Sequence, residues 1–248
     1  RQPTREMQRR CRRKRRAKMV RRLLYAAAVL LVAVAVAIVL YGGSSLHASA
    51  EPQPVAAPAD TPVQAEPTAQ PAAPGQYVVA IDPGHGGINP NIGAEDWGSE
   101  ADGVRESEVT LCTAQLLYEK LAADDRFAPL LTADGSTYLK PSERTAAARA
   151  AGADLLLSIH LNSDASAATN GLECYAAPPA LAANAESVRF GRLVTAAFRD
   201  QLGLTLRGWD GVRYLYFDAN NARVVAESSD TTVRSDPTFT VLEDCGCP

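Results

Sequence analysis

Histidine and cysteine are scarce in this sequence, and the cysteines follow no common motif. Three histidines and five cysteines occur among 248 residues. No two cysteines have C-x-x-C spacing, and Cys245 and Cys247 lie too close together for an easy mutual disulfide. We therefore expect the cysteines to pack as small apolar residues, and no disulfide can be deduced among those beyond the first 41 residues. These four are Cys112, Cys174, Cys245 and Cys247.

Acidic residues are almost absent from residues 1–22, which hold twelve Lys or Arg and a single acid, Glu6. The rest of the chain carries a net charge of −14. A basic segment of this kind could bind nucleic acid, but it directly precedes residues 23–41, which contain no charge. As a helix this stretch would measure about 28 Å, close to the hydrocarbon thickness of a bilayer. We therefore predict a transmembrane helix at 23–41 with residues 1–22 in the cytoplasm, and no nucleic-acid partner.

This topology places everything after the helix outside a bacterial cell membrane, as a single-pass protein facing the cell-wall space. A cleaved signal peptide is the alternative, because Ala48-Ser49-Ala50 resembles a processing site and cleavage near Ala50 would release the protein. A retained anchor is favoured because the apolar run is longer than a typical signal core. Residues 42–75 are rich in Ala and Pro, which predicts a linker of extended structure without a core.

Residues 76–248 are long enough for one domain of ordinary size, and no internal repeat is visible. Apolar runs predict strands, and apolar residues at helical spacing predict helices that alternate with them. The expected strands are 76–81, 127–132, 154–159 and 171–176, and the expected helices are 106–121, 141–151 and 183–202. Residues 212–217 and 223–227 flank a predicted hairpin turn at 218–221. This order indicates a single α/β domain whose mostly parallel central sheet is flanked by helices.

Two of the three histidines directly follow predicted strands, His85 in Asp-Pro-Gly-His-Gly-Gly and His160 in Ser-Ile-His-Leu-Asn. His47 lies close to the predicted membrane helix and looks incidental. If the strands are parallel, both imidazoles lie at the carboxyl edge of the sheet, where functional groups of such sheets gather. Two histidines and a carboxylate are a common set of ligands for a catalytic zinc ion.

The third ligand cannot be chosen from helix geometry. Glu106 and Glu108 both open a predicted helix near this edge and, two residues apart, they point to different faces. The neighbouring loop holds weaker candidates, namely Glu95, Asp96, Glu100 and Asp102. Asp82 and Asn162, beside the two histidines in sequence, are candidates for groups that orient the zinc ligands from outside.

Four ordered runs resemble a known family: VVAIDPGHGG, GVRESEVTL, ERTAAARAAGADLLLSIHLNS and GLECYA. They are similar to the zinc-dependent N-acetylmuramoyl-L-alanine amidases of the type-3 family, which cut the amide between muramic acid and L-alanine in peptidoglycan. The resemblance implies that His85, Glu106 and His160 bind Zn²⁺ and that peptidoglycan is the substrate. It also implies a central sheet of about six strands. No oligomeric state follows from it.

The resemblance further implies a glutamate near the C-terminus as general base, and two alignments are open. Glu243 could be this residue in a degenerate motif. Alternatively, residues 239–242 match the preceding segment, and the base lies beyond Pro248; this alignment is favoured because it keeps the family's spacing. The chain as printed is then expected to bind zinc and hydrolyse little. A non-catalytic peptidoglycan-binding module and a zinc peptidase acting on cross-links are the alternative functions.

Overall fold

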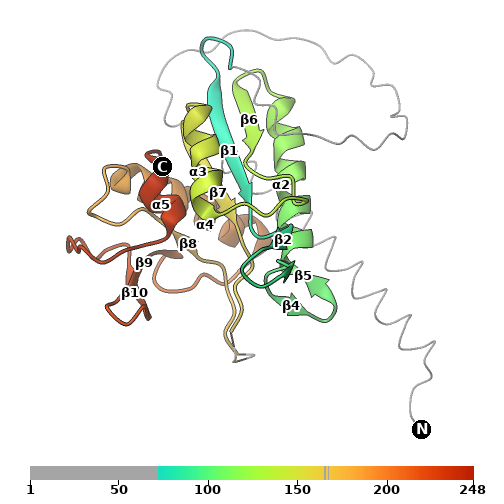
Figure 1. Ribbon diagram of the computed structural model, residues 1–248. Coiled ribbons are helices and arrows are strands. Elements are labelled where there is room, and N and C mark those ends of the chain that lie inside the picture. Colours follow the sequence, from blue (N-terminus) through green and yellow to red (C-terminus); the bar gives the residue numbers. More distant parts are fainter. Residues whose placement is uncertain (1–71, 165, 167) are drawn as a thin grey trace.

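The computed structural model describes residues 72–164, 166 and 168–248 (Figure 1). Within these ranges no helix has the length and apolar character needed to cross a membrane. The predicted cytoplasmic segment 1–22, the predicted transmembrane helix 23–41 and residues 42–71 of the predicted linker lie outside the described residues, so they stay predictions.

A parallel sheet of three strands forms the centre of the domain, in the order β6-β1-β7. Its strands are β1 (Tyr77–Pro83), β6 (Phe127–Leu131) and β7 (Leu155–Ile159). Strand β1 lies in the middle, and Val79, Ala80 and Ile81 have no solvent exposure. The first five residues of β1, Tyr77 to Ile81, are all apolar or aromatic, which suits this place because helices cover both faces of a parallel sheet.

The two faces of β1 meet different helices. Val79 and Ile81 pack in a core with side chains of α2 (Glu106–Ala122) and α4 (Asn184–Leu202). On the opposite face Asp82 meets Arg144 of α3 (Pro141–Ala150). Figure 1 shows α2 and α3 running alongside the strands of this sheet. The predicted arrangement, a mostly parallel sheet flanked by helices, is therefore confirmed.

The prediction of about six strands in one sheet is corrected by the structure. A second sheet of three strands has the order β10-β9-β8. It comprises β8 (Cys174–Tyr175), β9 (Val212–Phe217) and β10 (Arg223–Glu227), with β8 parallel and β10 antiparallel to β9. No strand of the described part pairs with the outer edge of β7, where the Leu156 amide donates to the carbonyl oxygen of Pro248 at 2.9 Å. The two sheets therefore remain separate.

The predicted hairpin is confirmed, because β9 and β10 pair across a turn that the Asp218 side chain stabilises through the amides of Asn220 and Ala222. The long segment between β1 and α2, which was expected to be a loop, contains two small hairpins. They are formed by β2 (Ile88–Asn89) with β3 (Ala94–Glu95) and by β4 (Glu100–Ala101) with β5 (Val104–Arg105). A short helix, α5 (Thr240–Cys245), packs against α3. The four described cysteines are free thiols; Cys245 is buried as predicted, but Cys112 is exposed, so the prediction of apolar packing is wrong for Cys112.

Candidate metal centre

His85 and His160 lie together because neighbouring parallel strands deliver them to the same edge. Pro83 pairs with Ile159 at the ends of β1 and β7, and each histidine follows within two residues. Their rings are 5.1 Å apart between centroids and meet edge to face at 79°. Gly84 makes this approach possible, since a Cβ atom there would lie 2.4 Å from Cε1 of His160. The predicted convergence of the two imidazoles is therefore present in the structure.

Glu106, the first residue of α2, completes the cluster. Its Oε1 atom lies 3.4 Å from Nε2 of His85 and 3.1 Å from Nδ1 of His160, and it accepts a hydrogen bond from the Leu161 amide. The Glu106 side chain is 4% exposed, whereas Glu108 is an exposed residue. The structure thus separates the two acids that helix geometry left undecided.

The donor set fits a divalent metal ion. One ligand atom from each of His85, Glu106 and His160 lies within 4.8 Å of the others. Tetrahedral zinc with bonds of about 2.0–2.2 Å brings ligand atoms to about 3.3–3.5 Å from one another. The measured separations of 3.1 and 3.4 Å at Glu106 Oε1 lie close to this value.

The electrostatics of the cluster favour a bound cation. Burial raises the pKa of Glu106, but hydrogen bonds from His160, His85, Ser99 and Leu161 outweigh it and hold that pKa far below its usual value. The hydrogen bond to Glu106 in turn raises the pKa of His85, against the opposing effect of burial. Glu106 is therefore an ionised carboxylate in a largely enclosed place, where a metal ion can replace the histidine proton as its counter-charge.

The backbone of His85 is held in an uncommon conformation by Arg144. The φ angle of His85 is 67°, in the left-handed region that non-glycine residues seldom adopt. Arg144 donates from Nη2 to the His85 carbonyl oxygen at 2.9 Å and from Nη1 to Pro83 O and Asp82 Oδ1. The side chains of Arg144 and Asp82 are 6% and 2% exposed, so they form a buried ion pair beneath the histidine loop.

Asp82 and Asn162, the two residues expected to orient the histidines, form other contacts in the described part of the chain. Asp82 accepts hydrogen bonds from Thr132 and Ser158 besides Arg144, so it reaches His85 only through the arginine and the backbone. The amide of Asn162 donates to Glu173 at 2.7 Å.

Sequence reasoning missed the groups that do contact the cluster. Asp96 Oδ1 lies 2.8 Å from Nδ1 of His85, and Ser99 donates two hydrogen bonds to Glu106. From the sequence Asp96 is only a weak candidate ligand, Ser99 lies in none of the four family-like runs, and Arg144 lies in the third of them without any sign of this role. All three contacts join segments that come together only in the folded chain.

Glu243, the alternative general base, lies on α5 as an exposed residue. Its Oε1 atom accepts a hydrogen bond from the Thr238 amide at 2.8 Å, just before the helix begins. The contact ties the carboxylate to the start of its own helix and satisfies an amide there. Neither prediction for the general base is tested by these contacts.

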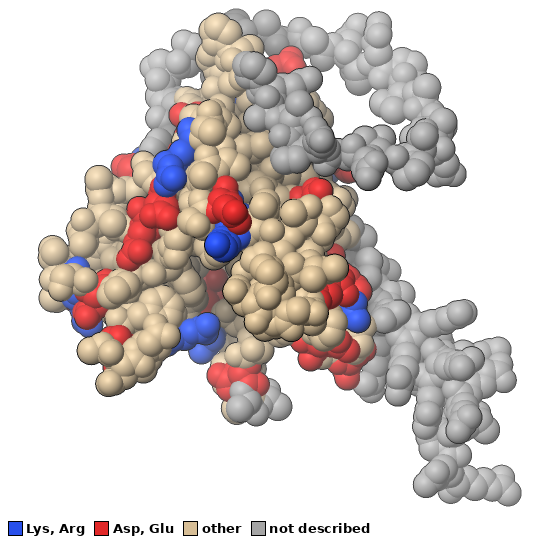
Figure 2. All heavy atoms as spheres, viewed as in Figure 1, with Lys and Arg blue, Asp and Glu red and all other residues tan. Residues whose placement is uncertain are grey.

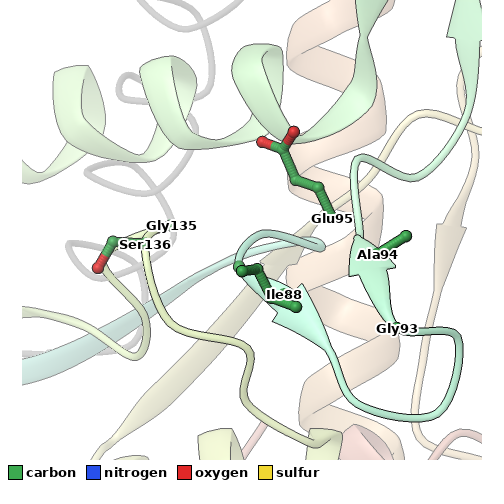
Figure 3. Close-up of a pocket in the computed structure, with 7 residues that line it drawn as sticks. Ile88, Gly93, Ala94, Glu95, Gly135 and Ser136 are labelled. Carbon is green, nitrogen blue, oxygen red and sulfur yellow. The ribbon is translucent and has the colours of Figure 1, made fainter.

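A shallow pocket of about 380 Å³ lies beside the histidine loop. It extends between the β2–β3 hairpin and the segment at Gly135 and Ser136, as Figure 3 shows. The Gly87 amide, two residues after His85, donates to the Gly135 carbonyl oxygen at 3.1 Å and joins the two walls. Fold and cluster together define a class of protein: an α/β domain with a candidate metal centre at the carboxyl edge of a parallel sheet.

Comparison with known proteins assigns the family. The model of the N-acetylmuramoyl-L-alanine amidase family Amidase_3 matches residues 79–228, more than half of the chain. The chain belongs to this family. The matched residues include the whole His85, Glu106 and His160 cluster.

Individual relatives agree with this assignment. The chain is 35% identical over 130 residues to the N-acetylmuramoyl-L-alanine amidase LytC of Bacillus subtilis, covering 52% of this chain and 24% of that relative. It is 38% identical over 85 residues to the amidase CwlM of Bacillus licheniformis, covering 34% and 31% of the two chains. The chain thus spans less than a third of either relative.

A solved structure shares the fold. The N-acetylmuramoyl-L-alanine amidase of Clostridium difficile 630 superposes with a TM-score of 0.51 at 22% identity, over 70% of this chain and 76% of that one. This similarity supports the α/β architecture described above.

Proposed function

We propose that this protein is a zinc-dependent peptidoglycan hydrolase that cleaves the amide between N-acetylmuramic acid and the L-alanine of the stem peptide. The observation that carries the proposal is the cluster of His85, Glu106 and His160, lying inside the segment that matches the amidase family. Two imidazoles and one carboxylate are the donor set of many hydrolytic zinc sites. Three protein ligands leave a fourth position for water or substrate.

The protein supplies the binding site and its electrostatics. Bound zinc would polarise the scissile carbonyl and lower the pKa of a water molecule towards neutrality. His85 and His160 would hold the ion through Nε2 and Nδ1, the atoms that face Glu106. The His160 side chain is 48% exposed, whereas that of Glu106 is 4% exposed, so the cluster is open to solvent on the His160 side. We expect substrate to approach from that side.

Analysis of reaction products tests this function. The full-length natural protein carrying this sequence, loaded with zinc, is incubated with purified peptidoglycan, and the released fragments are identified by mass spectrometry. Intact stem peptides that begin with L-alanine are expected, together with glycan chains that lack peptide. Shortened stems would instead indicate a peptidase, and binding without any release would indicate a non-catalytic wall-binding module.

A matched pair of variants links the activity to the cluster. Glu106→Gln removes a charged ligand and is expected to abolish both zinc binding and amide hydrolysis. Glu108→Gln makes the same change two residues away at an exposed position and is expected to leave both unchanged. Equal behaviour of the two variants would contradict the assignment of Glu106 as a ligand.

We further propose that residues 23–41 anchor the protein in the bacterial cell membrane and that the linker holds the domain in the cell-wall space. The twelve basic residues before the uncharged stretch support this orientation. Membrane fractionation and N-terminal sequencing of the mature protein test it. A new N-terminus near Ala50, with the protein found in the medium, would show a cleaved signal peptide instead.

A further inference from the structure

The segment from Asp96 to Ser99, here called the wall loop, contacts two members of the metal cluster, one through a hydrogen-bond acceptor and the other through hydrogen-bond donors. It presents a carboxylate oxygen to the ring nitrogen of His85 and hydrogen-bond donors to the carboxylate of Glu106. A histidine ligand needs an acceptor behind it, and a carboxylate ligand needs donors, so each contact suits its partner.

The first contact determines which nitrogen of His85 is available. Asp96 Oδ1 lies 2.8 Å from Nδ1, so an imidazole that donates its Nδ1 proton there has its lone pair on Nε2. Nε2 is the atom that faces Oε1 of Glu106 at 3.4 Å. The carboxylate of Asp96 therefore selects the tautomer in which His85 can bind a metal ion within the cluster.

Asp96 is itself held firmly against the histidine loop. Its amide donates to Gly87 O at 2.8 Å, and its carbonyl oxygen accepts from the Gly86 amide at 2.7 Å. The Gly98 amide also donates to Oδ1 at 3.3 Å. Since Gly86 and Gly87 directly follow His85 in the sequence, these backbone contacts tie the wall loop to the segment that carries this ligand.

The second contact gives the two carboxylate oxygens of Glu106 different partners. Both the amide and the hydroxyl of Ser99 donate to Oε2, each at 2.9 Å. Oε1 is left facing His85 and His160, which favours a single metal-binding oxygen. Gly98 closes the wall between them: a Cβ there would lie 2.5 Å from Cδ2 of His85 and 2.7 Å from Oε2 of Glu106.

The acidic residues on either side of Asp96 pair with Arg105 and not with His85. The contact between Asp96 and His85 is therefore specific to Asp96 and does not follow from the many acidic residues nearby. Figure 2 shows acidic side chains gathered over the β4–β5 hairpin. Arg105 lies 3.2 Å from Glu95 and 3.7 Å from Glu100, and its guanidinium stacks on the Trp97 ring at 4.5 Å. Asp96 lies between two of these residues in sequence and turns to the histidine instead.

We propose that Asp96 and Ser99 are positioning residues of the metal centre, Asp96 by orienting His85 and Ser99 by binding Oε2 of Glu106 so that Oε1 faces the two histidines. This inference rests on the proposed zinc binding. It assigns a role to a loop that contributes no ligand of its own to the cluster.

Zinc affinity, measured by competition with a chelator, tests the proposal without reference to catalysis. Asp96→Ala is expected to weaken zinc binding about 10- to 100-fold, the usual effect of losing such a partner. Asp96→Asn keeps an oxygen that can accept the Nδ1 proton, so a smaller loss is expected. Ser99→Ala removes one of two donors to Oε2, with an expected loss of about two- to tenfold.

The matched control is Asp102→Asn, which removes the same charge from an exposed position in the same region. Its φ of 54° suits asparagine, and no loss of zinc affinity is expected. Thermal unfolding of the metal-free variants measures general stability, and the visible spectrum of the Co²⁺-loaded proteins reports the geometry of the ligands. Together they distinguish a positioning role from a stabilising one. An altered Co²⁺ spectrum in Asp96→Ala, with a metal-free melting temperature close to that of the wild type, is expected.

Three results would overturn the proposal. The first is a zinc affinity of Asp96→Ala that equals the affinity of the Asp102→Asn control. Another is a loss in Asp96→Asn as large as in Asp96→Ala. The third is an unchanged Co²⁺ spectrum with a destabilised metal-free protein. Failure of the wild-type protein to bind zinc would instead contradict the proposed function, so the two failures are distinguishable.

Discussion

Arg144 donates a hydrogen bond to the carbonyl oxygen of His85 at 2.9 Å, and His85 has a φ of 67°. A helix on one face of the sheet thereby holds a candidate metal ligand in a backbone conformation that costs on the order of 1 kcal/mol for a residue with a side chain. The same guanidinium binds the buried carboxylate of Asp82. The stability of the domain and the shape of the candidate metal centre are therefore coupled at this arginine.

Arg144→Met is expected to destabilise the metal-free protein by about 3–5 kcal/mol, because it leaves the Asp82 carboxylate buried without its partner. Urea unfolding followed by circular dichroism measures the change. Arg199→Met is the control, since Arg199 pairs with Asp200 at an exposed position and little change is expected. A loss below about 1 kcal/mol in Arg144→Met would show that the buried pair does not support the fold.

Gly84→Ala is expected to weaken zinc binding at least tenfold, because its Cβ would lie 2.4 Å from the His160 ring and displace it. Gly203→Ala is the control, because Gly203 has a φ of 64° and no atom lies within 4 Å of the added Cβ. This variant should lose about 1 kcal/mol of stability and bind zinc as tightly as the wild type does. Calorimetric zinc titration and thermal unfolding of both variants separate the two effects. Equal zinc affinities would contradict the close packing of Gly84 on His160.

Acidification should release the metal. The hydrogen bond to Glu106 raises the pKa of His85 above its ordinary 6.5, so the metal-free folded protein holds this proton to higher pH than an unfolded chain does. Zinc needs the neutral imidazole, and its affinity should fall as the pH drops through the raised pKa. The metal-free protein should show the opposite trend. The stability that His85 contributes is complete below about pH 6.5 and is lost as the pH rises through the raised value.

Zinc titrations and urea unfolding between pH 5.5 and about 8.5 measure both trends. Glu106 has a lowered pKa, so its contribution to stability is present above its ordinary value of 4.5 and is lost at lower pH, outside this range. A zinc affinity that does not change with pH would show that no proton is displaced from His85 on metal binding.

Glu243→Gln should leave amide hydrolysis within about twofold of the wild-type rate. The Glu243 carboxylate is engaged by the Thr238 amide at the start of α5, and glutamine keeps an oxygen that can accept this hydrogen bond. Stability should therefore also change little. Dye release from labelled peptidoglycan by the full-length protein measures the rate. A fall of about a hundredfold or more would identify Glu243 as the general base.

Most of the longer strands and helices followed from the sequence alone, because they depend on local periodicity, whereas the two small hairpins between β1 and α2 and the helix α5 did not. Residues 77–81, shortly before His85, form an uninterrupted apolar run, as a strand buried on both faces requires, and the structure has β1 there. Parallel pairing of β1 with β7 then brings His85 and His160 to one edge. This pair could be predicted because only the direction of two strands had to be known.

The remaining features were decided by tertiary structure. Helix geometry left Glu106 and Glu108 equivalent; the resemblance favoured Glu106, and the packing of the first turn of α2 buries it beside the histidines. The expected six-stranded sheet divides into two because no described strand pairs with the outer edge of β7. The contacts of Arg144 and Asp96 with His85 join positions 59 and 11 residues apart. Local sequence patterns do not encode such contacts, since they depend on how helices and loops pack around the finished sheet.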